Sequence, residues 1–379
     1  MNAFDILEYY ELRKGEIISL IREIVDIESP SRDGDGSRMV ADWIEDQVRG
    51  TGAEHSIDRK LVDDGSHLVI RAFPDIGTVT VLLGHTDTVH PRGSTKRNPT
   101  RTDGDRMYGC GIFDMKANIV LMIEALRFFA RNGQKPGRPI TLVLCCDEEI
   151  GSYSGRSIVE QEASKAAECL VLEPSSEGRV KTGRKGTGMF RLKAHGVPAH
   201  AGLDPEKGAN AIAELARQVD RIHAVERPAT GTTVNVTTFN GGTTLNVIPE
   251  YAECEIDVRF SNPSEAERVK EALHTLKPVD PRVSLELTGA VNRMPLERNE
   301  AVIGLYERAR SLAAGFDYEL GETQVGGGSD GNFVAAMGVP VLDGLGITGD
   351  GAHTLDEHIF VSDIAKRATL ITQILSAKR

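Results

Sequence analysis

The stretch VTVLLGHTDTVH, at residues 79–90, decides how the fold and chemistry of this chain are interpreted. It begins as a short apolar run rich in β-branched residues, which predicts a buried strand leading to His85 and Asp87. Alternate residues of a strand share a face, so Asp87 can bond the second ring nitrogen of a metal-bound His85. The segment YGCGIFDMK, at 108–116, places Asp114 in a glycine-rich turn before an apolar helical pattern. We therefore predict that His85 and Asp114 are metal ligands.

Composition argues against several functional classes. The chain has 379 residues, which is long for one typical domain and suggests two. Its 44 basic and 56 acidic residues give a net charge of −12 without a Lys/Arg block, which argues against nucleic-acid or anionic-membrane binding. No apolar run reaches the ~18 residues of a membrane span, and residues 1–8 do not resemble a signal peptide. Five cysteines without framework spacing are typical of reduced thiols, so we expect a cytoplasmic protein.

The order of predicted elements indicates an α/β fold with a mainly parallel sheet. Helices are expected at 4–28 (broken at Gly15), 37–48, 118–131, 300–313 and 361–377. Strands are expected at 67–72, 78–84, 139–146, 166–172 and 340–342. Alternating strands and helices favour a parallel sheet covered on both faces, with binding residues at the carboxyl ends of its strands.

A second pattern occupies residues 184–294. Its predicted strands and helices follow the order strand, helix, strand, strand, helix, strand, at 189–195, 208–225, 233–239, 252–260, 264–276 and 282–287. This order is that of a ferredoxin-like α+β unit with an antiparallel sheet. We therefore predict a catalytic domain made of residues 1–183 and 295–379, interrupted by an inserted domain at 184–294.

Several acidic and histidine residues could join His85 and Asp114. They are Asp147-Glu148-Glu149, Glu173 and His353. Each has a structural alternative, because a lone histidine is more often structural, an aspartate after glycines can cap a helix, and an acidic triplet can be a solvated loop. Carboxylates gathered at strand ends repel one another unless cations neutralise them. Two histidines with three carboxylates suit a pair of borderline divalent metals such as zinc.

Five motifs together resemble the dizinc M20 metallopeptidases, the relatives of glutamate carboxypeptidase, acetylornithine deacetylase and succinyl-diaminopimelate desuccinylase. They follow the family's order along the chain: HTD at 85–87, GIFDMK at 111–116, DEEIGS at 147–152, LEP at 172–174 and GAHT at 351–354. Three further motifs look most similar to glutamate carboxypeptidase: GVPAHAG at 196–202, LNVIP at 245–249 and DVRF at 257–260.

The resemblance implies a set of metal ligands. Asp114 would bridge two Zn²⁺ ions, with Co²⁺ or Mn²⁺ as alternatives. His85 and Glu173 would complete one site, and Glu149 and His353 would complete the other.

The resemblance also implies catalytic roles close to these ligands. Asp87 would orient His85, and Glu148 would be the general base and acid acting on a water that the two metals activate. A cis peptide bond is expected between Asp114 and Met115. The other histidines, His90 among them, are expected to be structural.

The inserted domain would act as a lid and as the dimer contact. His200 would reach the active site of the partner subunit in a homodimer. Arg259 and Asn246 would hold a free carboxylate of the substrate, which suits the forked guanidinium of arginine, and Arg293 would add a contact to an acidic side chain. As structural alternatives, His200 could be a histidine of a surface turn, Arg259 could form a salt bridge on the sheet, and Asn246 could be the amide of a turn.

We therefore predict a dizinc hydrolase that cleaves an amide bond beside a free carboxylate. The leading substrate is a peptidyl or N-acyl amino acid with a C-terminal glutamate. The alternatives within this class are an amino-acid N-deacylase, of the acetylornithine deacetylase or desuccinylase kind, and a di- or tripeptidase. The alternative outside it is a non-catalytic binding protein, but such proteins usually lack a ligand or the base, and every expected position is filled here.

Overall fold

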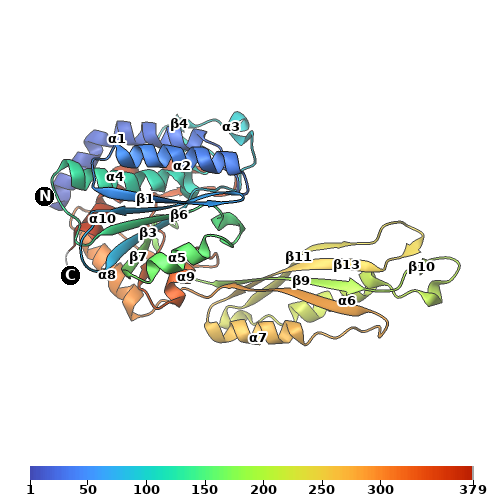
Figure 1. Ribbon diagram of the computed structural model, residues 1–379. Helices are drawn as coiled ribbons and strands as arrows, with labels where there is room; N and C mark the ends of the chain where they lie inside the picture. The colour runs from blue at the N-terminus through green and yellow to red at the C-terminus, as the bar shows by residue number, and fades with distance from the viewer. Residues whose placement is uncertain (378–379) are drawn as a thin grey trace. The chain divides into compact units, whose positions relative to one another are not determined.

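The computed structural model describes residues 1–377, which form two compact units (Figure 1). The first unit comprises Met1–Gly183, Arg298–Gln324 and the chain from Ser329 onward. The second comprises Arg184–Glu297 and Val325–Gly328, so the segment predicted at 184–294 leaves out residues 295–297 and 325–328 of this unit. No helix of the described chain is long and apolar enough to cross a membrane.

A six-stranded sheet forms the centre of the first unit, in the order β1-β2-β6-β3-β7-β16. Its strands are β1 His55–Val62, β2 Gly65–Ala72, β3 Val79–His85, β6 Ile140–Cys145, β7 Ala166–Val171 and β16 Val341–Leu342. Strands β6, β3, β7 and β16 lie side by side in that order and run parallel. At one edge of the sheet, β2 pairs antiparallel with β6, and β1 pairs antiparallel with β2. The predicted mainly parallel sheet is therefore confirmed.

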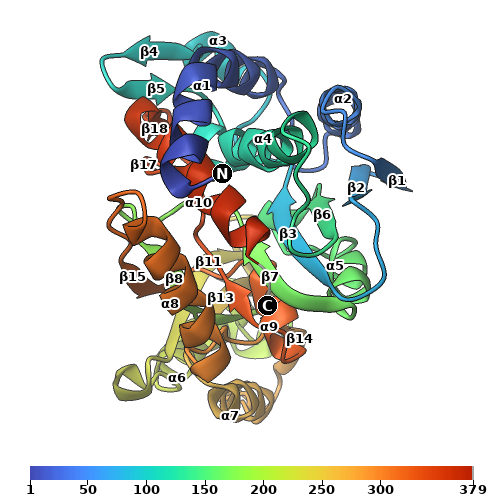
Figure 2. The same ribbon diagram turned by 90° about the vertical axis from the view of Figure 1, so that its left-hand side faces the viewer.

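Helices cover both faces of this sheet. Figure 2 shows α2 and α4 on one face and α5 on the other. The helices of the unit are α1 Ala3–Asp26, α2 Gly34–Arg49, α3 Ser94–Arg97, α4 Ala117–Arg131, α5 Arg156–Ala163, α8 Glu300–Ala314, α9 Gly331–Ala336 and α10 Ile364–Ser376. Strands β3 and β6 are almost wholly buried between the helical layers, which explains why they read as continuous apolar runs. All five cysteines are buried free thiols.

Helix α1 differs from its prediction, because it passes through Gly15 without a break. Its N-cap, Asn2, forms a capping box with Asp5. A glycine inside a helix costs ~1 kcal/mol relative to alanine. The apolar stripe continues on both sides of Gly15, from Tyr10 to Ile17 and beyond, and both of these side chains are fully buried. Burial of this stripe offsets the cost of the glycine.

Short strands complete the first unit. A small sheet in the order β17-β18-β5-β4 is built from β4 Arg101–Asp103, β5 Arg106–Tyr108, β17 Gly349–Asp350 and β18 His358–Phe360. Strands β8 Val180–Arg184 and β15 Glu322–Val325 form a separate pair. The small sheet brings the chain after residue 349 beside the chain before residue 108, and this placement matters for the site described below.

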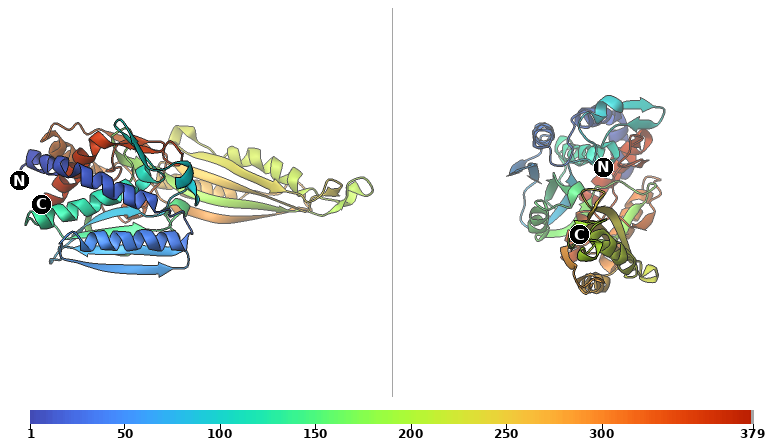
Figure 3. Two further views of the ribbon diagram at one scale, coloured as in Figure 1. Left: turned by 90° about the horizontal axis from the view of Figure 1, so that it is seen from above. Right: turned by 90° about the vertical axis from the view of Figure 1, so that its right-hand side faces the viewer.

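The second unit is a four-stranded antiparallel sheet in the order β11-β13-β9-β14. Its strands and helices are β9 Gly186–His195, α6 Ala211–His223, β11 Thr233–Gly241, β13 Tyr251–Phe260, α7 Pro263–His274 and β14 Ser284–Arg293. The predicted order of strands and helices is thus confirmed. The two helices pack along the sheet (Figures 1 and 3), and the buried residues of β13 alternate with half-exposed ones. A short pair, β10 Ala199–His200 and β12 Val247–Ile248, completes the unit.

Candidate metal centre

The carboxyl ends of three neighbouring parallel strands supply most of the predicted ligands. His85 is the last residue of β3, and Glu173 follows β7. Glu148 and Glu149 lie in a 3₁₀ turn, Glu148–Ile150, that follows β6. Because β6, β3 and β7 pair in parallel, their carboxyl ends meet at one edge of the sheet.

Asp114 reaches this edge from a tight turn, Ile112–Lys116, that precedes α4. The residue before the turn, Gly111, has a φ of 73°, and a Cβ atom there would lie 2.4 Å from Cγ2 of Thr88. Only glycine fits this position. The Asp114–Met115 peptide bond is cis, as predicted. Asp114 does not cap α4, whose N-cap is Lys116.

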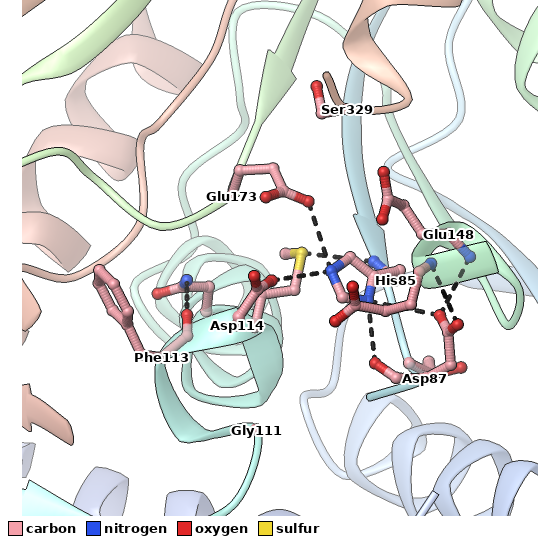
Figure 4. Close-up of polar contacts among 12 residues, drawn as sticks. His85, Asp87, Gly111, Phe113, Asp114, Glu148, Glu173 and Ser329 are labelled. Carbon is pink, nitrogen blue, oxygen red and sulfur yellow. Dashed lines mark hydrogen bonds and ion pairs between the residues drawn. The ribbon is translucent and has the colours of Figure 1, made fainter. Parts of the chain in front are cut away.

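The two oxygens of Asp114 face two different histidines. Oδ1 lies 3.0 Å from Nε2 of His85, and Oδ2 lies 3.5 Å from Nε2 of His353. On the first side, the same nitrogen of His85 lies 3.4 Å from Oε1 of Glu173. On the second side, the same nitrogen of His353 lies 3.2 Å from Oε2 of Glu149. The structure thus brings the five predicted ligands together as two groups that share Asp114. Figure 4 shows the first group, in which Asp114 and Glu173 both face His85.

Contacts within this cluster shift the pKa values of its members. Contacts with Asp114 and Glu149 raise the pKa of His353 to about 10. Burial acts to lower the pKa of His85, but its carboxylate neighbours, Asp114 foremost, outweigh burial and raise that pKa well above its usual range. Burial acts to raise the pKa of Asp114, yet its contacts with His353 and His85 lower it. The histidines and carboxylates thus favour one another's charged forms, and cations that bind here would supply the positive charge instead.

The donor set fits divalent metal ions. Oε1 of Glu149 is buried and has no hydrogen-bond partner among the described residues, and burial raises the pKa of this carboxyl group. A buried carboxylate oxygen without a partner is costly, and a cation would supply that partner. Ligand atoms of His85, Asp114 and Glu149 lie within 4.8 Å of one another, as do those of His85, Glu148 and Glu173. Imidazole nitrogens and carboxylate oxygens are ligands that zinc accepts.

Asp87 joins the two ligand-bearing segments. Nδ1 of His85 lies 3.0 Å from the carbonyl oxygen of Asp87 and 3.4 Å from its Oδ1. The backbone N–H groups of Glu148 and Glu149 donate to Oδ1 and Oδ2 of Asp87, at 3.1 and 3.2 Å. The hydroxyl of Ser31 donates to Oδ2 at 2.7 Å. The sequence pattern indicated only the link to His85, because nothing local marks a contact between residues 61 positions apart.

Glu357 is a residue that the sequence analysis did not single out. Its side chain is fully buried, and Oε2 lies 2.6 Å from Nε2 of His90. The only signal in the sequence is an acidic residue four positions after His353. His90, which was expected to be structural, is therefore a partner of a carboxylate that contacts the Asp114 turn.

Two predicted residues, His200 and Asn246, lie in short exposed strands and loops of the second unit. Nδ1 of His200 accepts hydrogen bonds from the backbone N–H groups of Gly202 and Leu203, both at 3.1 Å. The carbonyl oxygen of Asn246 accepts from the N–H of Ala201 at 2.9 Å. His200 lies on β10 and is paired with Val247 of β12, so Asn246, in the turn just before β12, lies close to it.

The two predicted arginines of the second unit differ in exposure. Arg259, on β13, is half-buried, and its Nη2 lies 2.8 Å from Oδ2 of Asp257. Arg293, the last residue of β14, is buried, and its Nη1 donates to Oδ1 of Asn292 at 2.8 Å. Their roles toward a substrate, like that of His200, stay predictions, because the metal-binding candidates belong to the other unit.

Comparisons with known proteins identify relatives along almost the whole chain. A sequence model of the family described as Peptidase family M20/M25/M40 matches residues 81–377. Carboxypeptidase G2 from Pseudomonas sp. (strain RS-16) is 27% identical over 367 residues, covering 95% of this chain and 88% of that protein. Succinyl-diaminopimelate desuccinylase from Delftia acidovorans is 32% identical over 311 residues, covering 76% of this chain and 78% of that protein.

Solved structures share the fold. Aminopeptidase PepT from Bacillus cereus matches with a TM-score of 0.75 at 22% identity, covering 96% of this chain and 98% of that chain. The M20 family metallo-carboxypeptidase Sso-CP2 from Sulfolobus solfataricus matches with a TM-score of 0.73 at 16% identity, covering 95% and 98%.

Proposed function

The chain belongs to peptidase family M20/M25/M40, and from that premise we propose a dizinc carboxypeptidase that releases a C-terminal glutamate from a peptidyl or N-acyl substrate. Membership makes the chain a metal-dependent hydrolase of the peptidase or N-acyl deacylase type. The observation that carries the proposal of two metals is the pair of ligand groups that share Asp114, one on each of its oxygens.

We assign the ligands by the side of Asp114 that they face. His85 and Glu173 would hold one ion and Glu149 and His353 the other, with Zn²⁺ as the expected metal and Co²⁺ or Mn²⁺ as alternatives. Two such ions, when bound, lower the pKa of a water molecule and polarise the carbonyl group of a substrate.

Glu148 is the proposed proton carrier. Its carboxylate lies with donor atoms of His85 and Glu173 within 4.8 Å of one another, and its backbone N–H is fixed by Asp87. From this position Glu148 takes a proton from the attacking water and delivers it to the nitrogen of the leaving amine. Replacing Glu148 by Ala should abolish turnover while the metal content stays at about two ions per chain. Turnover near the wild-type rate would remove Glu148 from this role.

Arginine side chains of the second unit are proposed to select the substrate. The guanidinium of Arg259 is half-exposed, and its Nε and Nη2 donate to the carboxylate of Asp257. A substrate carboxylate could replace Asp257 as the partner of this guanidinium. Asn246 would assist Arg259, and Arg293 would contact the side-chain carboxylate of glutamate. The sequence similarity to carboxypeptidase G2 supports a free α-carboxylate in the substrate.

A homodimer through the second unit is the proposed assembly, with His200 completing the site of the partner subunit. The imidazole of His200 is exposed, and its Nδ1 is fixed by two backbone N–H groups, which leaves Nε2 to donate to the oxyanion of the tetrahedral intermediate. Mixing a His200→Ala subunit with a Glu148→Ala subunit tests this. Activity in the mixed dimer supports a shared site, and inactive mixed dimers, verified by mass, would contradict it. The buried free thiols favour a cytoplasmic location.

A desuccinylase-type N-deacylase is the second candidate, because several matched relatives of that name are at least 30% identical to this chain. A substrate panel separates the two. Zinc-loaded enzyme is assayed for glutamate release from folate-like and N-acyl glutamate substrates, and for amine release from N-succinyl-diaminopimelate and N-acetylornithine. Faster turnover of a deacylase substrate would overturn the glutamate assignment and leave the hydrolase class intact.

A further inference from the structure

We propose that Glu357 is a positioning residue that fixes the bridging geometry of Asp114, an inference that rests on the proposed dizinc function. Glu357 lies between the ligand His353 and strand β18, and its side chain is fully buried. Among the described residues, it belongs to neither group of possible ligand atoms that lie within 4.8 Å of one another. Instead, its carboxylate contacts the backbone of the turn that carries Asp114.

Four donors converge on the two oxygens of Glu357. Oε1 accepts from the backbone N–H groups of Phe113 and Asp114, both at 2.9 Å. Oε2 accepts from the N–H of Gly111 at 2.8 Å and contacts Nε2 of His90 at 2.6 Å. A buried carboxylate is costly unless hydrogen bonds satisfy both of its oxygens, and here they do.

The turn needs this acceptor because its backbone is irregular. Gly111 is left-handed, and Asp114 has φ −117° and ψ 89°, which are not helical values. The N–H groups of residues 111, 113 and 114 therefore cannot all find acceptors in a regular helical ladder, and unpaired buried N–H groups cost free energy. Binding all three groups to one carboxylate fixes the direction in which the Asp114 side chain leaves the turn.

Glu357 also links two ligand-bearing segments. It follows His353 by four residues, and the intervening loop leads into β18, which pairs with β5. The N–H of Gly109 donates to the backbone oxygen of Glu357 at 3.2 Å, next to the three side-chain contacts. One residue thus sets the distance between the His353 loop and the Asp114 turn. If Asp114 bridges two metals, Glu357 determines whether both of its oxygens face their histidines.

Replacing Glu357 by Gln tests this inference, because the change keeps the size of the side chain and removes one acceptor oxygen. Either orientation of the amide points an NH₂ group at donors that the carboxylate had satisfied. We expect metal affinity to fall roughly 10- to 100-fold, as for other residues that orient ligands. We also expect a changed visible absorption spectrum of the Co²⁺-substituted protein, since that spectrum reports ligand geometry.

Glu124→Gln is the matched control. Glu124 is another fully buried carboxylate of the same unit, on α4, and it pairs with Arg13 and Arg127 instead of the Asp114 turn. Its replacement removes a buried negative charge in the same way, so it should lower stability while leaving metal affinity and the Co²⁺ spectrum as in the wild type. A stability effect alone is thereby separated from a positioning effect.

The outcomes distinguish this inference from the function beneath it. A wild-type protein that binds no divalent metal overturns the proposed function itself. Wild-type metal affinity and an unchanged Co²⁺ spectrum in Glu357→Gln, with the wild type binding metal, overturn the role of Glu357 alone. If Glu357→Gln does not fold, His90→Ala decides, because it removes one donor and keeps the carboxylate. A smaller loss of affinity with a spectral change supports the proposal, and wild-type values for both contradict it.

Discussion

Replacing Asp87 by Asn should weaken the hydrogen bonds that this side chain accepts from the turn carrying Glu148 and Glu149. The carboxylate of Asp87 accepts from the N–H of Glu148 through Oδ1 and from the N–H of Glu149 through Oδ2. Asparagine keeps one acceptor oxygen. The cheaper orientation places its NH₂ toward Ser31, whose hydroxyl can accept as well as donate, and leaves the N–H of Glu149 without an acceptor.

The size of the effect follows from that lost acceptor. A buried N–H group left unsatisfied costs ~1–3 kcal/mol. If the lost hydrogen bond displaces Glu148 and Glu149 and its whole cost raises the activation free energy, kcat/KM falls by roughly 5- to 150-fold, since 1.36 kcal/mol corresponds to a factor of ten. Contact of His85 with the carbonyl oxygen of Asp87, at 3.0 Å, is kept, so metal is still bound, although more weakly.

The assay combines steady-state kinetics with metal analysis and thermal unfolding. Ser31→Ala is the matched control, because it removes only the hydroxyl contact to Asp87 and should change kcat/KM by a few-fold at most. Wild-type kcat/KM and metal affinity in Asp87→Asn would refute the reasoning. So would an equal loss in Ser31→Ala, because the backbone N–H groups of the Glu148 turn would then not be the cause.

Three further predictions concern the turn, the substrate carboxylate and the metal. Gly111→Ala should lower stability to urea by about 2–4 kcal/mol, since its Cβ would overlap Thr88, whereas Gly104→Ala, equally left-handed but in open space, should cost less. Arg259→Lys should raise KM about tenfold with little change in kcat, while Arg191→Lys, on a neighbouring strand, should not. Chelation of the metal should lower Tm reversibly, because a ligand at 1,000 times its Kd stabilises by ~4 kcal/mol.

Each of these predictions has a contrary result. Equal losses in the two glycine variants would show that backbone conformation, not overlap with Thr88, limits the turn. Equal KM values for the two arginine variants would remove Arg259 from substrate binding. A Tm that is insensitive to chelator and to added Zn²⁺, with the protein shown to be metal-free, would argue against a metal centre that couples to folding.

Sequence patterns predicted the features that repeat along the chain. Buried strands such as β3 and β6 were found because their apolar residues are continuous, and the second unit was found because its strands alternate. Strand β1 was not predicted, because it lies at an edge and its polar residues are half-exposed. The break expected at Gly15 was wrong, because packing on both sides of the glycine holds the helix together.

At the candidate site, the chemical type of each ligand could be predicted, but the contacts that orient the ligands could not. His85, Glu149 and Glu173 stand next to strand ends, which is a local signal. The contact between Glu357 and the Asp114 turn joins residues 243 positions apart, and its donors are backbone N–H groups that every residue carries. No pattern of side chains in one sequence reports such a pairing, which is why the role of Glu357 was not predicted.

The placement of His353 and Glu357 after the second unit in the sequence affects when the site can form during synthesis. Strands β3, β6 and β7, with Asp114, leave the ribosome first and carry most of the candidate donors. Until residues 353 and 357 emerge, the Asp114 turn lacks the acceptor for its N–H groups, and one side of Asp114 lacks its histidine. A nascent chain therefore completes the centre only after the inserted unit has been made, so hydrolytic activity should appear late in translation.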